Sequence, residues 1–280
     1  MSNVRKAKHG WVLTLIFSLI SIAYVMPIVI VLMNSFKRKI FISNRPFALP
    51  DAKSFVKIEN YINGIQKTDF FRAFGYTLFI TVGSVFVIVL CTSMCAWYIS
   101  RVKNKWTTGI YYLFAFSMIV PFQMVMFTLS KIADMLHLGN PVGIIIVYLG
   151  FGAGLAVFMF CGFVRSIPLE IEESAMIDGC NPVQTYFKIV FPIMKPTAIS
   201  VAILETMWVW NDYLLPYLVL KINKYKTIQI AIQYLKGGYG AIDMGAMMAM
   251  IVLAIIPIIL FYGFCQKYII EGVISGAVKG

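Results

Sequence analysis

Charged side chains are scarce in this sequence, and the shortage decides the class of protein before any motif is considered. Only 13% of the 280 residues are Asp, Glu, Lys or Arg, whereas 60% are hydrophobic. A soluble globule of this length needs more polar residues than that to cover its surface. The composition therefore excludes an ordinary soluble domain and indicates a chain whose solvent is lipid.

Two further absences and the net charge narrow the function. No G-x-x-x-x-G-K motif occurs, so the chain carries no nucleotide-binding P-loop of its own. The five cysteines fit no metal-ligand or disulfide pattern, and we expect no metal site. The net charge of +12 comes from basic residues spread through every loop, which favours contact with a membrane surface over binding of nucleic acid.

Long apolar runs are abundant. A run of roughly 20 apolar residues crosses about 30 Å of hydrocarbon as a helix. Because backbone groups in lipid must bond within their own segment, continuous runs predict helices rather than a barrel. We therefore expect an all-α membrane protein with six spans and both termini on one side. The six runs are Trp11–Phe36, Phe74–Ser100, Trp106–Ser130, Val142–Val164, Thr197–Leu220 and Met244–Tyr268.

The loops divide the chain into three parts. Residues 1–72 hold an N-terminal tail, the first span and a hydrophilic loop, residues 73–268 form a core with the other spans, and residues 269–280 form a tail. On the side opposite the termini, the segment 221–243 contains a glycine-rich turn that we expect to be flexible. Lys and Arg are nearly equal in number on the two sides, so the positive-inside rule does not orient the chain.

The one long connection on the side of the termini, residues 165–196, gathers acidic residues. Pro168 suits the first turn of a helix, the carboxylates suit the positive end of its dipole, and Gly179 suits a left-handed C-terminal stop. This pattern predicts a helix of about three turns, roughly 16 Å long. The acidic residues are Glu170, Glu172, Glu173 and Asp178.

A second short helix is predicted directly after this glycine. Asn181 is a good N-cap, Pro182 fits the first helical position, and Gln184 completes a capping-box arrangement. Three apolar residues then share one helical face, until two prolines interrupt the run. The apolar residues are Val183, Phe187 and Val190, and the prolines are Pro192 and Pro196.

Two interpretations of this connection stay open on the residues alone. It could be an amphipathic connector at the membrane surface with solvated acids. Alternatively it docks to a partner, because interfacial helices usually offer Lys or Arg to anionic lipid, whereas carboxylates suit a basic protein.

The same stretch carries a family resemblance. The segment Glu173-Ser-Ala-Met-Ile-Asp178-Gly179, followed by an aromatic, an aliphatic and spaced prolines, resembles the EAA loop of permease subunits from binding-protein-dependent ABC importers. Ser174 and Cys180 stand where that family has alanine. About residues 60–280 are similar to the carbohydrate-importing branch, in the class of the smaller permease of the maltose transporter. Further matching segments are Pro121 with Gln123, Gly162–Pro168, Trp210–Tyr213 and Gln266–Gly280.

The resemblance implies a type I importer permease fold with a cytoplasmic coupling helix in residues 165–196. It implies a second permease subunit, two cytoplasmic ABC ATPase subunits that bind ATP and Mg²⁺, and an extracytoplasmic sugar-binding protein as partners. This chain would then be a non-catalytic translocation subunit of a prokaryotic plasma membrane, with cytoplasmic termini and a sugar substrate, preferably an oligosaccharide. The residues expected at the ATPase are Glu172, Glu173, Ser174, Ala175, Asp178, Gly179, Cys180, Phe187 and Pro192, with Gly276, Ala277, Lys279 and Gly280 of the tail.

The fifth apolar run contains two carboxylates, Glu205 and Asp212, each costing about 2.5 to 3.5 kcal/mol if charged at the bilayer centre. They should therefore face a water-filled cavity or a polar partner. An aromatic, an amide and a carboxylate at spacings of three and four suit a sugar, and equally suit an interfacial belt with helix–helix hydrogen bonds. The candidates for a substrate path or outer gate are Gln123, beside an expected kink at Pro121, and Glu205, Trp208, Trp210, Asn211 and Asp212.

A secondary transporter or channel that works without an ATPase is the main alternative. Carriers of the inverted-repeat type have matching halves with broken helices at corresponding places. Here the long connection occurs once, and its acidic cluster has no counterpart between the second and third runs. A membrane-embedded enzyme would need paired reactive groups, and no nucleophile–base motif is visible.

Overall fold

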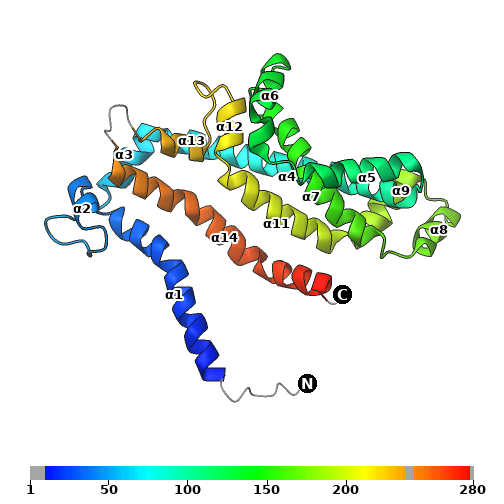
Figure 1. The fold of residues 1–280 in the computed structure, drawn as a ribbon, viewed down its shortest axis with the longest axis horizontal. Helices are drawn as coiled ribbons and strands as arrows, with labels where there is room; N and C mark the ends of the chain where they lie inside the picture. The colour runs from blue at the N-terminus through cyan, green and yellow to red at the C-terminus, as the bar shows by residue number, and fades with distance from the viewer. Residues whose placement is uncertain (1–9, 237–241, 278–280) are drawn as a thin grey trace. The chain divides into compact units, whose positions relative to one another are not determined.

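The computed structural model of the protein describes residues 10–236 and 242–277, with side chains as far as residue 268 (Figure 1). Apart from two isolated bridges, Lys37 with Phe55 and Lys236 with Ile242, these residues form helices, turns and loops. The expected all-α class is therefore confirmed.

Among the residues that the structure describes, four helices are long and apolar enough to cross a membrane, and two bent helix pairs raise the number of spans to as many as six. The bent pairs are α5 (Lys105–Ser117) with α6 (Phe122–Met135), at 107°, and the segment 182–193 with α11 (Lys195–Asn211), at 75°. The continuous helices are α1 (Gly10–Asn34), α4 (Phe70–Arg101), α7 (Gly143–Val164) and α14 (Met244–Ala277).

The third apolar run is two helices rather than one. Pro121 is the N-cap of α6, and a proline lacks the N–H that would bond to the carbonyl of Ser117, while its ring would collide with that carbonyl. α5 therefore ends at Ser117. The position of the expected kink was right, but the prediction of one continuous helix over Trp106–Ser130 was wrong.

The fifth run is also interrupted. α11 ends at Asn211, and α12 (Leu214–Val219) begins after a two-residue break. Pro216 occupies the third position of α12, where no intrahelical acceptor exists for the missing N–H. The prediction of one continuous helix over Thr197–Leu220 was therefore wrong.

The chain divides into two units, and the first comprises residues 1–70 and 232–257. The hydrophilic loop after the first span is folded rather than loose. It contains α2 (Lys39–Asn44) and α3 (Glu59–Thr68). The Asn60 amide donates to the carbonyls of Ser35 and Lys37, at 2.8 and 2.9 Å, and the buried Lys37 ammonium donates to the Arg45 carbonyl at 3.1 Å. We call residues 35–70 the platform.

The second unit, residues 71–231 and 258–280, is built around α7. Phe160 and Tyr148 on this helix are fully buried. Two of its glycines allow close packing, because a Cβ at Gly152 would collide with Ile88 of α4, and one at Gly154 would collide with Ser117 of α5. Small residues that let helix backbones approach are typical of interfaces between membrane helices.

The segment 221–243 holds the short helix α13 (Ile228–Gln233). Ile228 and Ile230 are fully buried, and the Ile228 amide donates to the Thr77 hydroxyl at 2.9 Å. Much of the expected loop is therefore packed structure. The turn predicted to be flexible at Gly237, Gly238 and Gly240 lies outside the described residues.

The last helix is longer than its apolar run. α14 continues past Tyr268, where the tail was expected to begin, and ends at Ala277. No proline follows Tyr268, and a glycine inside a helix costs only about 1 kcal/mol. Gly276 and Ala277 are thus helical, while Lys279 and Gly280 lie outside the described residues.

Candidate functional site

The connection between α7 and α11 begins with α8 (Leu169–Ile177), which carries Glu170 and Glu172 in its first turn. Pro168 is the N-cap, one position earlier than predicted. With nine residues the helix is about 14 Å long, shorter than the three turns expected. The shorter length follows because Asp178 already leaves the helical conformation, with ψ near 5°.

Gly179 ends this helix as predicted. Its φ is +85°, and its amide bonds to the Met176 carbonyl at 3.0 Å. The Cys180 amide reaches back to the Ala175 carbonyl, also at 3.0 Å, and these two bonds together form a Schellman turn. A Cβ at position 179 would meet nothing within 4 Å, so glycine is required here by conformation rather than by space.

The second helix starts as predicted. In α9 (Pro182–Thr185), the Asn181 side chain accepts from the Gln184 amide at 2.9 Å, and Gln184 accepts from the Asn181 amide at 3.0 Å. This reciprocal pair is the expected capping box.

The continuation of this helix differs from the prediction. Residues 186–190 form a π-helix, labelled η1 (Tyr186–Val190), followed by α10 (Phe191–Ile193). The wider turn changes the spacing, so Val190 is buried whereas Val183 and Phe187 are exposed. Pro192 and Pro196 occupy the first turns of α10 and α11, and so begin helices rather than interrupt one.

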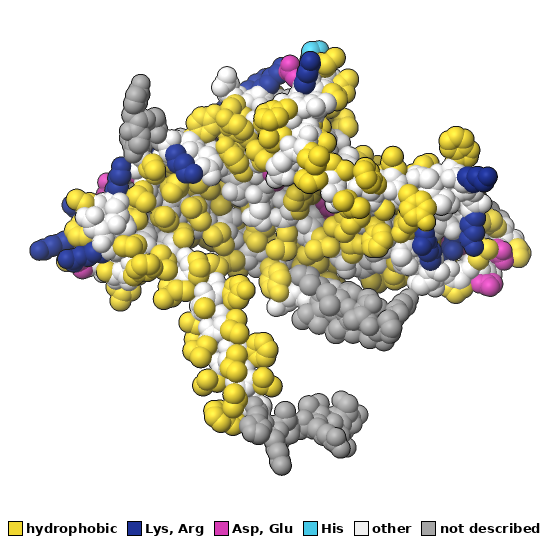
Figure 2. Space-filling view, in the orientation of Figure 1, with side chains coloured by type: hydrophobic (Ala, Val, Ile, Leu, Met, Phe, Trp, Pro, Cys, Tyr) yellow, Lys and Arg dark blue, Asp and Glu magenta, His cyan; other side chains and the backbone are white. Residues whose placement is uncertain are grey.

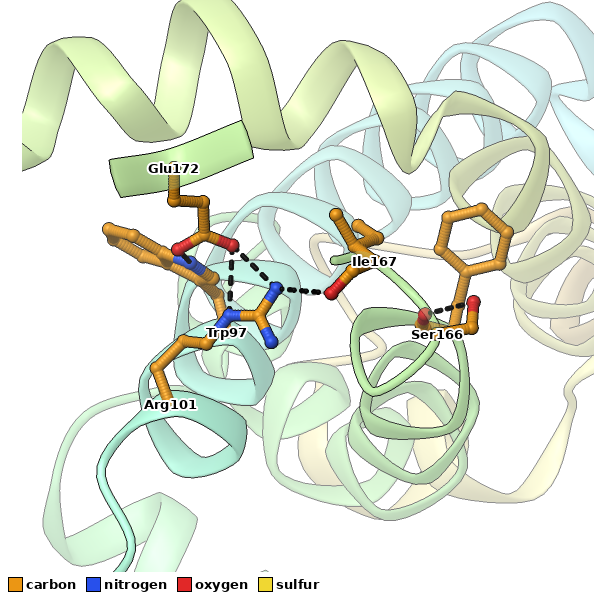
Figure 3. A network of polar contacts seen from close by, with 6 residues as sticks. Trp97, Arg101, Ser166, Ile167 and Glu172 are labelled. Atoms are coloured by element: carbon orange, nitrogen blue, oxygen red, sulfur yellow. Dashed lines mark hydrogen bonds and ion pairs between the residues drawn. The ribbon is translucent and has the colours of Figure 1, made fainter. Parts of the chain in front are cut away.

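Glu172 is the buried member of the acidic cluster, with 1% of its side chain exposed. Its Oε1 accepts from Nε and Nη2 of Arg101, at 2.8 and 2.6 Å, and its Oε2 accepts from Nε1 of Trp97 at 2.9 Å (Figure 3). The same Nη2 donates to the Ile167 carbonyl at 3.0 Å. Both oxygens of the carboxylate are therefore satisfied within the chain.

The π-helical segment η1 is also held by α4, the helix that carries Trp97 and Arg101. The hydroxyls of Tyr186 and Ser93 are 2.6 Å apart, and the Tyr186 and Trp97 rings pack with centroids 5.5 Å apart. Ser93, Trp97 and Arg101 are spaced by four residues, so they lie on one face at the end of α4. We call these three residues, with Glu172 and Tyr186, the α4 clamp.

The structure sorts the residues expected at the ATPase into two groups. Glu172 and Ala175 point inward and are buried within this chain, and their expected role in coupling to the ATPase stays a prediction. Cys180 is half-buried. The exposed members are Glu173, Ser174, Asp178, Gly179, Phe187 and Pro192.

Sequence reasoning missed residues of both groups. Ile177, the last residue of α8, is 86% exposed, which is unusual for an isoleucine. Its signal in the sequence is its place directly before Asp178 and Gly179. Arg101 and Trp97 were missed because they lie about 70 residues before their partner. Their signal is a single arginine ending an apolar run, four residues after a tryptophan.

The residues proposed for a substrate path only partly converge. Tyr148 of α7 packs edge-on against Trp208, with centroids 5.4 Å apart, and its hydroxyl donates to Asp212 Oδ2 at 3.0 Å. The other oxygen of Asp212 accepts from the amides of Leu214 and Leu215, at 3.0 and 3.3 Å, which caps α12. Asp212 is therefore held by three internal donors.

The remaining candidates are divided between exposed and buried positions. Trp210 is buried against Phe74, whereas Trp208 is 40% exposed. Asn211 is exposed and bonds back to the Met207 carbonyl at 2.7 Å, and Gln123 is exposed in the first turn of α6. The structure thus brings Trp208 and Asp212 together through Tyr148, and does not group Trp210 with them.

Glu205 is buried beside Gly152, and its Oε2 has no hydrogen-bond partner among the described residues. This carboxyl lies on α11 where that helix packs closely on α7. Among the residues that the structure describes, no group of three or more His, Cys, Asp or Glu is placed to hold a metal ion.

Comparison with known proteins adds a family. Residues 88–275 match the family described as "Binding-protein-dependent transport system inner membrane component". The match covers the C-terminal part of α4, from which Ser93, Trp97 and Arg101 come, together with α7 and the connection from α8 to α11.

Two known sequences are similar over nearly their whole length. One is the probable starch degradation products transport system permease protein AmyC of Thermoanaerobacterium thermosulfurigenes, 36% identical over 269 residues, covering 96% of this chain and 97% of that protein. Another is the multiple sugar-binding transport system permease protein MsmG of Streptococcus mutans, 31% identical over 282 residues, covering 100% of both chains.

A solved structure shares the fold. A chain in the crystal structure of a bacterial ABC transporter involved in the import of the acidic polysaccharide alginate superposes with a TM-score of 0.79 at 21% identity. The superposition covers 96% of this chain and 99% of that chain. At this identity the likeness concerns the fold alone.

Proposed function

Because this chain belongs to the family of binding-protein-dependent transport system inner membrane components, we propose that it is the permease subunit of an ATP-driven sugar importer. The names of the similar proteins, which concern starch degradation products and multiple sugars, support a sugar, and we favour an oligosaccharide. The chain is a multi-pass membrane protein in which the side carrying α8 faces the cytoplasm. Translocation, rather than catalysis, is its task.

The observation that carries this proposal is the two-sided construction of α8. Its inner side is fixed to α4 by a buried ion pair, while its outer side presents exposed acids and an exposed isoleucine. Because its inner side is fixed to α4, this short helix can be displaced together with α4 as one rigid body. Rigid-body displacement is a common form of conformational switching. The exposed acids suit a basic cleft on a cytoplasmic ATPase subunit.

The partners follow from this arrangement. Two ABC ATPase subunits bind ATP and Mg²⁺, which suits a chain that has no P-loop motif. A second permease subunit completes the path, and an extracytoplasmic binding protein delivers the sugar, as the family description supports. Of the path candidates, Trp208 offers the exposed aromatic face on which a sugar ring can stack.

Gly179→Val provides the test of coupling. A β-branched residue at φ +85° costs more than about 1 kcal/mol in conformation, although no atom blocks its Cβ. We expect the variant to insert and to co-purify with the ATPase, but to hydrolyse ATP without matching sugar uptake in proteoliposomes. Gly179→Asn is the control, because asparagine tolerates the left-handed conformation and should retain most of the coupling.

Two outcomes would contradict the proposal. Wild-type uptake in Gly179→Val would remove the turn from the coupling path. Sugar transport by the isolated chain in liposomes, without any ATPase, would overturn the function itself and favour a secondary carrier. A cysteine introduced as Ile177→Cys should in addition form an adduct with the ATPase in membranes, since this side chain is the most exposed apolar group of α8.

A further inference from the structure

A pocket lies where α4 and α7 end and α5 begins. It has a volume of about 420 Å³ and is lined by residues from the end of α4, the start of α5 and the position just after α7. Three of its lining residues are basic, and none is acidic. The basic residues are Arg101, Lys103 and Arg165.

Two of these cations have no ion-pair partner among the described residues, and the third keeps one free nitrogen. Lys103 and Arg165 form no ion pair within the part of the chain that the structure describes. Arg101 is paired with Glu172 through Nε and Nη2, but its Nη1 has no hydrogen-bond partner among the described residues. The Arg165 guanidinium lies over the Tyr111 ring, 4.9 Å from its centroid, which holds this charge at the wall of the pocket.

The start of α5 adds to the positive potential. This helix has 13 residues, and its N-terminal end, where the dipole is positive, lies at the pocket through Thr107 and Thr108. The hydroxyls of these two residues already donate to the carbonyls of Val102 and Asn104, so this helix end contributes its dipole to the pocket rather than hydroxyl donors.

The surroundings of the pocket are those of a membrane boundary. Trp106 is 83% exposed and Tyr112 is 65% exposed, and exposed aromatics of this kind mark the level of the lipid headgroups. Further along α5, Leu113 and Phe116 are also exposed. In Figure 2, dark-blue basic side chains lie next to yellow hydrophobic ones at this end of the second unit.

We propose that this pocket binds the phosphate of an anionic membrane phospholipid, with the acyl chains lying along the exposed apolar side of α5. Basic pockets between membrane helices on the cytoplasmic side are suited to phosphate headgroups, and a phosphate diester carries the single charge that these side chains can neutralise. The lipid would brace the joint between α4, α5 and α7 beside the α4 clamp. The inference does not depend on which solute the complex carries.

The purified complex, in a neutral detergent, can be titrated with dihexanoyl phosphatidylglycerol, with dihexanoyl phosphatidylcholine and with inorganic phosphate, and the bound species counted by native mass spectrometry. We expect one phosphatidylglycerol per chain and weaker or no binding of phosphatidylcholine. The affinity of the double variant Lys103→Gln/Arg165→Gln for phosphatidylglycerol should fall by more than about tenfold. Each of the two basic residues attracts the anionic headgroup, and the variant loses both attractions.

Controls separate this site from general charge. Lys188→Gln/Lys195→Gln removes two exposed basic residues on the same side of the membrane and should leave binding unchanged. If the first double variant fails to assemble, Lys103→Glu reverses an exposed charge that makes no hydrogen bond among the described residues, and should weaken binding similarly.

Three results would overturn the proposal. Equal affinity for the two lipids would show that the pocket does not select an anionic headgroup. Equal losses of affinity in the control variant would show that binding depends on general charge and not on this pocket. Binding of inorganic phosphate as tight as that of phosphatidylglycerol would assign the pocket to a free phosphate instead of a lipid.

Discussion

Glu172 shows how the surroundings of one residue can differ from what its place in the sequence suggests. It stands in an acidic cluster that suits docking, yet its carboxylate accepts three hydrogen bonds from α4 and is buried. Removing one member of a buried ion pair leaves the other charge uncompensated, at a cost of about 3 to 5 kcal/mol. The inner side of α8 is thus held on α4 by an ion pair that is costly to break.

Arg101→Met should therefore destabilise the protein by about 3 kcal/mol or more and lower sugar uptake per ATP hydrolysed. The measurements are thermal unfolding of the purified complex and the ratio of uptake to hydrolysis in proteoliposomes. Arg101→Met/Glu172→Leu should recover much of the stability, because no charge is then left buried, but not the coupling.

Lys105→Met is the matched control, since this basic residue lies four positions further on and is exposed. If Arg101→Met behaves as this control does, the ion pair has no part in stabilising α8. A full recovery of coupling in the double variant would mean that the position of α8 depends on packing alone.

Local patterns predicted some of these residues and not others. The capping box of Asn181 with Gln184 and the turn at Gly179 were readable because each involves residues within five positions of one another. The partner of Glu172 was not, because Arg101 is distant in sequence and nothing local distinguishes a buried carboxylate from a solvated one.

The interrupted runs show where periodicity alone gave the wrong element. Apolar residues continue from Ser117 to Pro121, and Asn211 with Asp212 is only a short polar interruption of the fifth run, so both runs read as single spans. The prolines break them, and in the second case Asp212 stabilises the new helix start by capping α12. A proline in an apolar run can mark a kink or a full break, and tertiary packing decides between them.

Asp212 should accordingly be more important for structure than for binding sugar. Asp212→Ala removes a helix cap and the acceptor for Tyr148, and should cost about 1 to 3 kcal/mol of stability. Asp212→Asn keeps the cap through its carbonyl oxygen, so its loss should be smaller and similar to that of Tyr148→Phe. Thermal unfolding ranks the three variants, and sugar competition assays should show unchanged preference.

One result would contradict this prediction and support a place for Asp212 in the substrate path. That result would be a changed sugar preference in Asp212→Asn together with an unaltered unfolding temperature.

The first unit joins parts of the chain that are far apart in sequence. Lys67 at the end of α3 forms an ion pair with Asp243, whose side chain also accepts from the Ala246 amide at the start of α14. Burial raises the pKa of Asp243, but the hydrogen bonds from Lys67 and Ala246 outweigh it and hold the pKa below its ordinary value.

The sign of the resulting pH effect follows from this lowered pKa. A carboxyl with a depressed folded-state pKa contributes stability above its unfolded pKa of about 3.9, and that stability is lost as the pH falls through the folded pKa. Acidification from about pH 6 towards pH 3 should lower the unfolding temperature more in the wild type than in Asp243→Asn. The difference is at most about 1 kcal/mol, because the pair is partly exposed.

Lys67→Met should flatten the pH dependence in the same way, because it removes the same ion pair. Equal slopes in the wild type and in both variants would show that the pair contributes nothing to the stability of this unit.

The sequence predicted the class of the whole molecule and the existence of its apolar segments, because hydrocarbon thickness imposes a length that composition reveals. It did not predict that the segments 37–72 and 221–243 are folded. Their stability comes from buried side chains such as Asn60 and Ile228, whose partners are backbone groups or hydroxyls elsewhere in the chain.

The platform also sets an order of events during synthesis. Gly245 packs so closely on Asn60 that a Cβ there would overlap the amide, and Met250 covers Gly64 and Thr68 of α3. These covering residues leave the ribosome some 180 positions after the platform itself. A nascent chain that does not yet include the start of α14 therefore carries an open platform, whose covering contacts form only once that helix has been made.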